Sequence, residues 1–163
     1  METPLSGNYI DDKFKIYFPD IGLLVASFPI SLTSEILSGG LGANKGAIYE
    51  SIAADMLYKA DIPLFYHEDT LHHLENDFLV ENNEGIDIYE VKATNGRMAS
   101  AKAILEKNSP YRNQIKHVYK LIDKSYGEGG FYKSFPRFLL GFKMEIETEK
   151  AIGELKVDPL PKI

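Results

Sequence analysis

The feature that most constrains the fold of this chain is a turn signal between two segments rich in β-branched and aromatic residues. Residues 82–85 read Asn-Asn-Glu-Gly and separate residues 72–80 from residues 86–93. Asparagine and glycine readily adopt the backbone conformations that tight turns between antiparallel strands require. The sequence therefore predicts a β-hairpin with a four-residue loop, in which Glu81 pairs with Ile86.

This register brings ionisable side chains together. Asp77 lies opposite Glu90 on one face of the predicted hairpin, with Cβ atoms roughly 5 Å apart, and Lys92 follows on the same face. Two adjacent carboxylates repel each other, which a folded protein tolerates when a cation lies between them. Lys92 is one candidate cation and a divalent metal ion is the other. The chain has no cysteine, and oxygen ligands favour Mg²⁺ or Mn²⁺ over zinc.

A third carboxylate comes from a predicted helix over residues 44–59, with Asn44 as its N-cap. Glu50 lies on the same face of this helix as Ala53 and Leu57. A glutamate beside the core needs a metal, a cation or a hydrogen-bond donor as a partner. The alternative is a glutamate at the border of the apolar face that extends into water. His72 and His73 begin the predicted strand 72–80 and could suggest a zinc site. They are interpreted as surface or edge residues, because adjacent strand residues point to opposite faces.

The remaining elements are predicted from periodicity and from breaker residues. A short strand and then a helix from about Asp20 are expected within residues 14–28. Further expected elements are strands at 64–67 and 131–135, a helix at 98–107, a strand at 115–123 where helical spacing also fits, a turn at 127–130 and one or two helical turns at 136–144. Length predicts one domain, residues 1–163, with a core of about 14–143 and a loosely held tail at 144–163.

Composition excludes several classes of protein. The glycine-rich residues 39–46 match neither the P-loop nor the dinucleotide fingerprint, so no nucleotide-hydrolysing module is expected. No apolar run is long enough to span a membrane, and the first seven residues do not resemble a secretory signal, so a cytoplasmic protein is predicted. Residues 1–91 contain 4 Lys+Arg and 16 Asp+Glu, whereas residues 92–143 contain 11 and 3. This basic segment either follows a phosphate backbone or forms ordinary solvated faces.

The ordered set of Glu50, Asp77, Glu90 and Lys92 resembles the PD-(D/E)XK nuclease superfamily. The segments around these residues, together with residues 16–24, resemble the C-terminal domain of prokaryotic AAA-type ATPases that is known as domain of unknown function 4143. The Lys-Gly-x-x-x-Glu sequence that ends at Glu50 is also similar to archaeal-type Holliday-junction resolvases. Asn76 departs from the superfamily pattern, which has proline at this position.

The resemblance implies an α/β, restriction-endonuclease-like core with a mixed central sheet of about four strands flanked by helices. It further implies metal-dependent cleavage of DNA and association with an AAA-type ATPase module. Asp77, Glu90 and Glu50 would bind Mg²⁺ or Mn²⁺, and Lys92 would orient or deprotonate the attacking water.

Two other hypotheses stay open at this point. One is a catalytically inactive nuclease-fold domain that binds DNA or a partner protein, because fold does not determine function. The other is a structural or dimerisation module, in which Lys92 neutralises Asp77 and Glu90 as an ion network. The sequence does not decide whether the chain forms a homo-oligomer.

Overall fold

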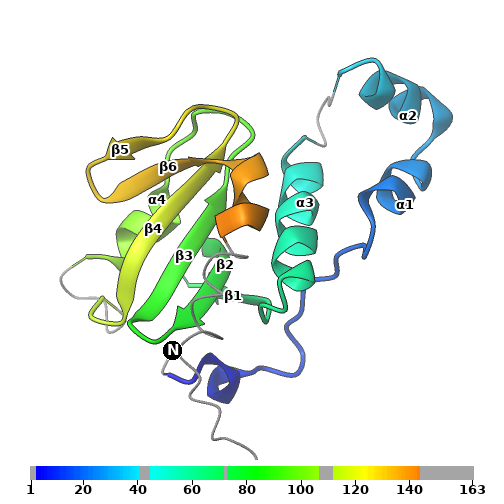
Figure 1. The fold of residues 1–163 in the computed structure, drawn as a ribbon. Helices are drawn as coiled ribbons and strands as arrows, with labels where there is room; N and C mark the ends of the chain where they lie inside the picture. Colours follow the sequence, from blue (N-terminus) through cyan, green and yellow to red (C-terminus); the bar gives the residue numbers. More distant parts are fainter. Residues whose placement is uncertain (1–2, 41–44, 72, 107–111, 144–163) are drawn as a thin grey trace, which may run out of the picture.

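The computed structural model of the protein describes residues 3–40, 45–71, 73–106 and 112–143. Within these residues six strands form one mixed sheet in the order β1-β2-β3-β4-β6-β5 (Figure 1). The strands are β1 (Phe65–Asp69), β2 (Leu74–Asn82), β3 (Gly85–Val91), β4 (Ile115–Ile122), β5 (Gly127–Gly129) and β6 (Tyr132–Pro136). The helices are α1 (Ile21–Ala26), α2 (Ile30–Leu37), α3 (Lys45–Lys59) and α4 (Ala99–Ile104), with 3-10 turns at η1 (Leu5–Asn8) and η3 (Arg137–Leu139).

The sheet combines an antiparallel half with a parallel centre. Strands β1, β2 and β3 pair antiparallel, whereas β3, β4 and β6 are parallel and β5 pairs antiparallel with β6. Parallel neighbours require a crossover connection, and α4 lies within the connection between β3 and β4. The carboxyl end of β3, where the predicted site residues lie, is therefore next to the carboxyl end of β4.

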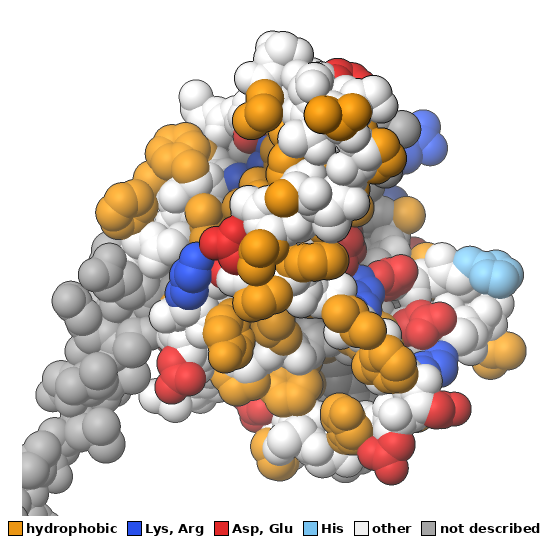
Figure 2. Space-filling model, turned by 90° about the vertical axis from the view of Figure 1, so that its right-hand side faces the viewer, with side chains coloured by type: hydrophobic (Ala, Val, Ile, Leu, Met, Phe, Trp, Pro, Cys, Tyr) orange, Lys and Arg blue, Asp and Glu red, His pale blue; other side chains and the backbone are white. Residues whose placement is uncertain are grey.

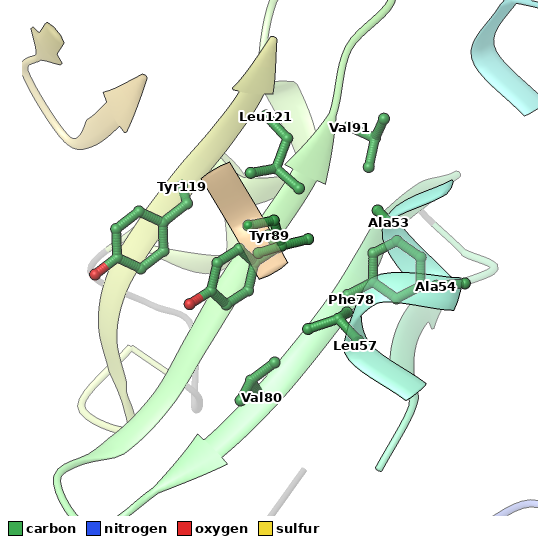
Figure 3. Close-up of a cluster of buried hydrophobic side chains, with 10 residues drawn as sticks. Ala53, Ala54, Leu57, Phe78, Val80, Tyr89, Val91, Tyr119 and Leu121 are labelled. Atoms are coloured by element: carbon green, nitrogen blue, oxygen red, sulfur yellow. The ribbon is translucent and has the colours of Figure 1, made fainter. Parts of the chain in front are cut away.

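Alternate residues of the central strands supply two hydrophobic cores. On one face, Leu57 of α3 packs with Phe78 and Tyr89, and all three side chains are almost completely buried (Figure 3). On the other face, Ile88 packs with Ala101 of α4. Burial of these side chains holds each helix against its own face, because a fully buried large apolar side chain contributes about 1.5–3 kcal/mol. The two helices therefore cover opposite faces of the sheet.

The predicted hairpin register is confirmed, and its loop is shorter than expected. Glu81 pairs with Ile86, and Asn82 also pairs with Gly85, so the connection has two residues rather than four. The Oδ1 atom of Asn82 accepts the backbone N–H groups of Glu84 and Gly85 at 2.9 and 3.1 Å. Gly85 has φ +144, a value that disfavours other residue types. The β2–β3 ladder is therefore one pair longer than predicted, because Asn82 and Gly85 belong to it.

The prediction of about four strands is wrong for the described residues, which contain six. Five of the six strands correspond to strands that the sequence patterns predict, and the sixth, β5, arises because the predicted turn at 127–130 is itself a short strand. Gly127 and Gly129 pair with Ser134 and Tyr132, while Gly130 makes the turn with φ +66. Glycine weakens a strand, so this pairing depends on the neighbouring β6 rather than on local preference.

Other expectations have mixed outcomes. Helix α1 begins after Asp20, whose Oδ1 atom accepts the N–H of Leu23 at 2.9 Å, as expected of an N-cap. Helix α3 ends at Lys59 as predicted, and the ambiguous segment 115–123 is strand β4. The strand expected before Asp20 is wrong, because those residues join no ladder of the sheet. Helix α4 is shorter than the predicted 98–107. The predictions for Asn44, His72 and the tail at 144–163 lie outside the described residues, and His73 is exposed as expected.

Helices α1 and α2 extend away from the sheet beyond α3 (Figure 1). None of their residues is buried. Hydrophobic side chains are numerous on the face of the molecule shown in Figure 2. The large apolar residues that are exposed among residues 3–40 are Tyr9, Ile10, Phe14, Ile16, Phe18, Leu23, Ile30 and Leu37. No described helix has both the length and the apolar character needed to cross a membrane. The cytoplasmic location stays a prediction.

Candidate functional site

Helix α3 positions the first carboxylate of the site. Ala53, Ala54 and Leu57 are almost completely buried against the sheet, and two of these side chains are small. Small residues allow a helix axis to approach a sheet closely, because little side-chain volume separates the two. Glu50 lies one turn before them and is half-buried. The carboxylate of Glu50 therefore points toward β2 rather than into open solvent, as its contacts confirm.

Three carboxylates converge at the N-terminal half of β2. Oxygen atoms of Glu50, Glu75 and Asp77 all lie within 4.8 Å of one another. Glu75 and Asp77 are two residues apart in a strand, so they share a face. The sequence prediction included Glu50 and Asp77 but missed Glu75. Glu75 could have been identified from its spacing, because it lies two residues before Asp77 in the same predicted strand.

Asp77 is held at the point where the β2–β3 ladder ends. The last pair of the ladder is Phe78 with Tyr89, in the predicted register. Beyond it, the Oδ2 atom of Asp77 accepts the backbone N–H of Val91 at 2.7 Å, so a side chain replaces the next backbone partner. This bond fixes the carboxylate at the mouth of the hairpin.

The environment of Asp77 favours its protonated form. Burial, then the negative charge of Glu90 and to a smaller extent that of Glu50 raise the pKa of Asp77 to about 7, against the opposing effects of Lys92 and the Val91 N–H. The predicted repulsion between Asp77 and Glu90 is therefore present. A cation that binds here has to displace a proton at mildly acidic pH.

Glu90 has its own set of partners. Its side chain is almost completely buried, and its two oxygens accept hydrogen bonds from Asn76 Nδ2 at 2.8 Å and Lys92 Nζ at 2.7 Å. Glu90 does not belong to the group of three carboxylates. The Asn76 side chain supplies a neutral donor where the superfamily pattern has proline, which has no side-chain donor.

Lys92 is a permanent cation at this position. Burial lowers the pKa of Lys92, but the hydrogen bond and charge of Glu90, with the charges of Asp77 and Glu50, outweigh burial and raise its pKa above the ordinary value. Its ammonium group therefore stays protonated at physiological pH and acts as a donor. Its ammonium group contacts Glu90, and its charge also acts on Asp77 and Glu50.

The extended segment before α1 contributes two residues that sequence reasoning missed. Lys15 Nζ lies 2.9 Å from Glu50 Oε1 and also forms an ion pair with Glu75. The Tyr17 hydroxyl donates to the same Glu50 oxygen at 2.6 Å. Burial opposes the charge of Lys15, but its bonds to Glu75 and Glu50 raise the pKa of Lys15 overall. Lys15 is therefore the intramolecular counter-ion of the carboxylate group.

The chemistry of the three carboxylates fits a hard divalent cation. All the donors are oxygens, which Mg²⁺ and Mn²⁺ prefer, and neither cysteine nor histidine belongs to the group. The oxygens are close enough together to bind one ion. Lys15 would have to leave Glu50 and Glu75 before a metal ion could bind the oxygens that Lys15 now contacts. The site therefore has two competing cationic partners, one of them built into the chain.

Comparison with known families gives one match. The model of the family described as domain of unknown function (DUF4143) matches residues 45–136. The chain belongs to this family. The matched DUF4143 region covers more than half of the chain, from the first residue of α3 to the last residue of β6. It contains Glu50, Glu75, Asp77, Glu90 and Lys92, whereas Lys15 and Tyr17 precede it. No curated protein and no solved structure matches the chain significantly.

Proposed function

We propose that this DUF4143 domain is a magnesium-dependent nuclease or DNA-processing domain that hydrolyses phosphodiester bonds in association with an AAA-type ATPase module. The observation that carries the proposal is the group of Glu50, Glu75 and Asp77, with Lys92 beside it. Helix, strand and hairpin supply these residues in the order in which the PD-(D/E)XK superfamily has its acidic residues and lysine. The mixed sheet with helices on both faces agrees with a restriction-endonuclease-like core.

Glu50, Glu75 and Asp77 would hold Mg²⁺ or Mn²⁺ in this proposal. When bound, the ion supplies Lewis-acid polarisation of a phosphoryl oxygen and a lowered pKa of a coordinated water. Lys92 donates hydrogen bonds to a phosphate oxygen, a role that suits an ammonium group whose pKa is raised. Glu90 and Asn76 hold Lys92 in place through the Glu90 carboxylate. Glu90 would be available to a metal ion only if Lys92 left its carboxylate.

Tyr17 would orient Glu50, the metal ligand that α3 supplies. Its hydroxyl donates to Glu50 Oε1, the oxygen that also contacts Lys15. Burial and the charge of Glu50 raise the pKa of Tyr17, which therefore keeps its proton and remains a donor. This hydrogen bond restricts the rotation of the Glu50 side chain and reduces the entropy lost on metal binding.

A cleavage assay tests the enzymatic proposal. Supercoiled plasmid, linear duplex and branched DNA are incubated with the protein and Mg²⁺ or Mn²⁺. Cleavage by the wild type is expected to be lost in Asp77→Asn and Lys92→Met and retained in Lys59→Ala, which changes an exposed lysine on α3. Cleavage that persists in Asp77→Asn, or that survives excess EDTA, would contradict the assignment of the site.

A second candidate function is a non-catalytic domain that binds a partner protein. Two observations favour it: Lys15 already neutralises Glu50 and Glu75, and the segment from residue 9 to residue 37 exposes many apolar side chains. Contiguous exposed apolar surface is typical of interaction sites. Sedimentation of the wild type and of Ile16→Ser tests whether this surface forms a homo-oligomer. A monomer that neither binds metal nor cleaves DNA would favour a heterologous partner, such as an ATPase module.

A further inference from the structure

A second polar region lies at the carboxyl end of β4, on the face of the sheet that α4 covers. It is a cavity of about 430 Å³, within the usual range for small-molecule sites. Its lining residues are Asn95, Gly96, Arg97, Met98, Ala99, Lys102, Lys120, Phe131 and Tyr132. None of the residues of the carboxylate group lines it. Three cationic side chains and two aromatic rings surround one space, with no carboxylate among the lining residues.

Lys120 is the most informative residue of this cavity. Its side chain is 2% exposed, and its Nζ donates to Asn95 Oδ1 at 2.8 Å. The ammonium also lies 5.3 Å from the centre of the Tyr132 ring. Among the described residues no carboxylate forms an ion pair with it, in contrast to Lys15 and Lys92. Burial, and then the positive charges of Lys124 and Lys92, lower the pKa of Lys120.

A buried ammonium without an acidic partner costs free energy. Asn95 and Tyr132 compensate for only part of its lost hydration, because Asn95 supplies a neutral acceptor and Tyr132 supplies only the quadrupole of its ring. An apolar residue at this position of β4 would suit the neighbouring core better. An anion that enters the cavity would supply the charged partner that Lys120 lacks among the described residues.

The remaining lining residues indicate which anion fits. Arg97 and Lys102 are exposed at the rim, where they add two positive charges. Phe131 is 39% exposed and meets Tyr132 edge to face at 5.2 Å. Phosphates bound by lysine and arginine, with bases stacked on aromatic rings, are the usual contacts of single-stranded nucleic acids. A simple inorganic anion would need no exposed aromatic ring.

We propose that this cavity binds a nucleotide of single-stranded nucleic acid, with its phosphate near Lys120, Arg97 and Lys102 and its base against Phe131. Lys120 pairs with Glu90 in the β3–β4 ladder, so the cavity lies beside the strand end that carries Lys92. We expect a nucleic-acid strand bound here to extend past this end of β3. The inference rests on the proposed function for its substrate, but the binding itself requires no metal.

Fluorescence anisotropy of a labelled short oligothymidylate, in EDTA, measures this binding separately from catalysis. Loss of one charged contact is expected to weaken binding about tenfold in Arg97→Ala and in Lys102→Ala. Each loss also reduces the salt dependence of log K by about 0.7. Phe131→Ala is expected to weaken binding by about fivefold or more, because a base no longer stacks on this ring. Lys59→Ala removes a lysine from α3, on the opposite face, and is expected to bind as the wild type does.

The results have distinct meanings. Weakening in the Arg97, Lys102 and Phe131 variants but not in Lys59→Ala supports the proposal. Competition by thymidine monophosphate at concentrations as low as those of unlabelled oligonucleotide, with the same pattern of variants, would identify a free nucleotide as the ligand and overturn the assignment to a nucleic-acid strand. No binding by the wild type, or equal weakening in Lys59→Ala, overturns it. Calorimetry with Mg²⁺ on Arg97→Ala separates the two sites, because metal binding is expected to be unchanged there.

Discussion

Replacing Asp77 with asparagine is expected to stabilise the metal-free protein at alkaline pH and to have little effect at mildly acidic pH. In the folded protein the pKa of Asp77 is raised to about 7 from an ordinary value of 3.8, first by burial and then by the charge of Glu90. The folded state therefore binds more protons than the unfolded state between these two values. The free energy of unfolding of the wild type falls as pH rises through this window and becomes constant above it.

The size of the effect follows from the shift. About three pKa units at about 1.4 kcal/mol each give a contribution of about 4 kcal/mol, present below the unfolded pKa and lost above pH 7 or so. Asparagine has the shape of the protonated carboxyl group, and its amide oxygen can still accept the Val91 N–H. Asp77→Asn therefore keeps the contacts of the neutral form and removes the pH dependence that this group causes.

Urea unfolding of wild type and Asp77→Asn in EDTA, at about pH 5 and about pH 8.5, measures the difference. About two of these three pKa units lie between pH 5 and the folded pKa of about 7, so the variant is expected to gain about 3 kcal/mol relative to the wild type between the two pH values. Asp12→Asn changes an exposed position and serves as the control. The difference in unfolding free energy between this variant and the wild type is expected to be the same at both pH values. A stability difference between Asp77→Asn and wild type that is the same at both pH values would refute the reasoning.

Three further predictions concern other parts of the structure. Lys15→Met is expected to raise the affinity for Mg²⁺ about tenfold in calorimetry, since the ion no longer competes with this ammonium group. Lys13→Ala loses only an exposed ion pair with Glu68 and is expected to leave the affinity unchanged. Lys120→Met is expected to stabilise the free protein by about 1–2 kcal/mol in urea unfolding, because a buried charge without a carboxylate partner is removed. Leu57→Ala is expected to destabilise it by about 2–5 kcal/mol, since this side chain is fully buried between α3 and the sheet, and a loss below 1 kcal/mol or so would contradict the core assignment.

The hairpin and its register were accessible from the sequence because local chemistry determines them. The turn residues restrict the pairing of Glu81 with Ile86, and every later pair follows from the period of two residues in a strand. Helix α3 was accessible for a similar reason, because its small and apolar residues recur with helical spacing. The carboxylates on these elements, Glu50 and Asp77, could therefore be brought together before the fold was known.

The contributions of Lys15 and Tyr17 depend on tertiary structure. Their segment alternates like a strand, yet in the structure the apolar Phe14 and Ile16 are exposed and the polar residues point inward. Hydrophobic periodicity predicts the opposite arrangement. The attraction of Lys15 to Glu50 and Glu75, together with the hydrogen bond of Tyr17, accounts for the reversal within the described residues.

The strand at one edge of the sheet, β5, could not be predicted. Residues 127–129 are mostly glycine, which local propensity assigns to a turn, and only the neighbouring β6 makes them a strand. The environment of Glu90 was likewise hidden, since its bond with Asn76 crosses the hairpin beyond the regular ladder. Both features depend on how elements meet rather than on the composition of either element.

Calorimetric titration of Mg²⁺ into the wild type, Glu75→Gln and Asp77→Asn at alkaline pH tests the central claim most directly. The group of three carboxylates predicts saturable binding by the wild type that is lost in both variants. Glu68→Gln, which changes an exposed glutamate paired with Lys13, is expected to bind metal normally. Absence of binding by the wild type at millimolar Mg²⁺, or binding that survives in both Glu75→Gln and Asp77→Asn, would contradict the assignment of these residues as a metal site.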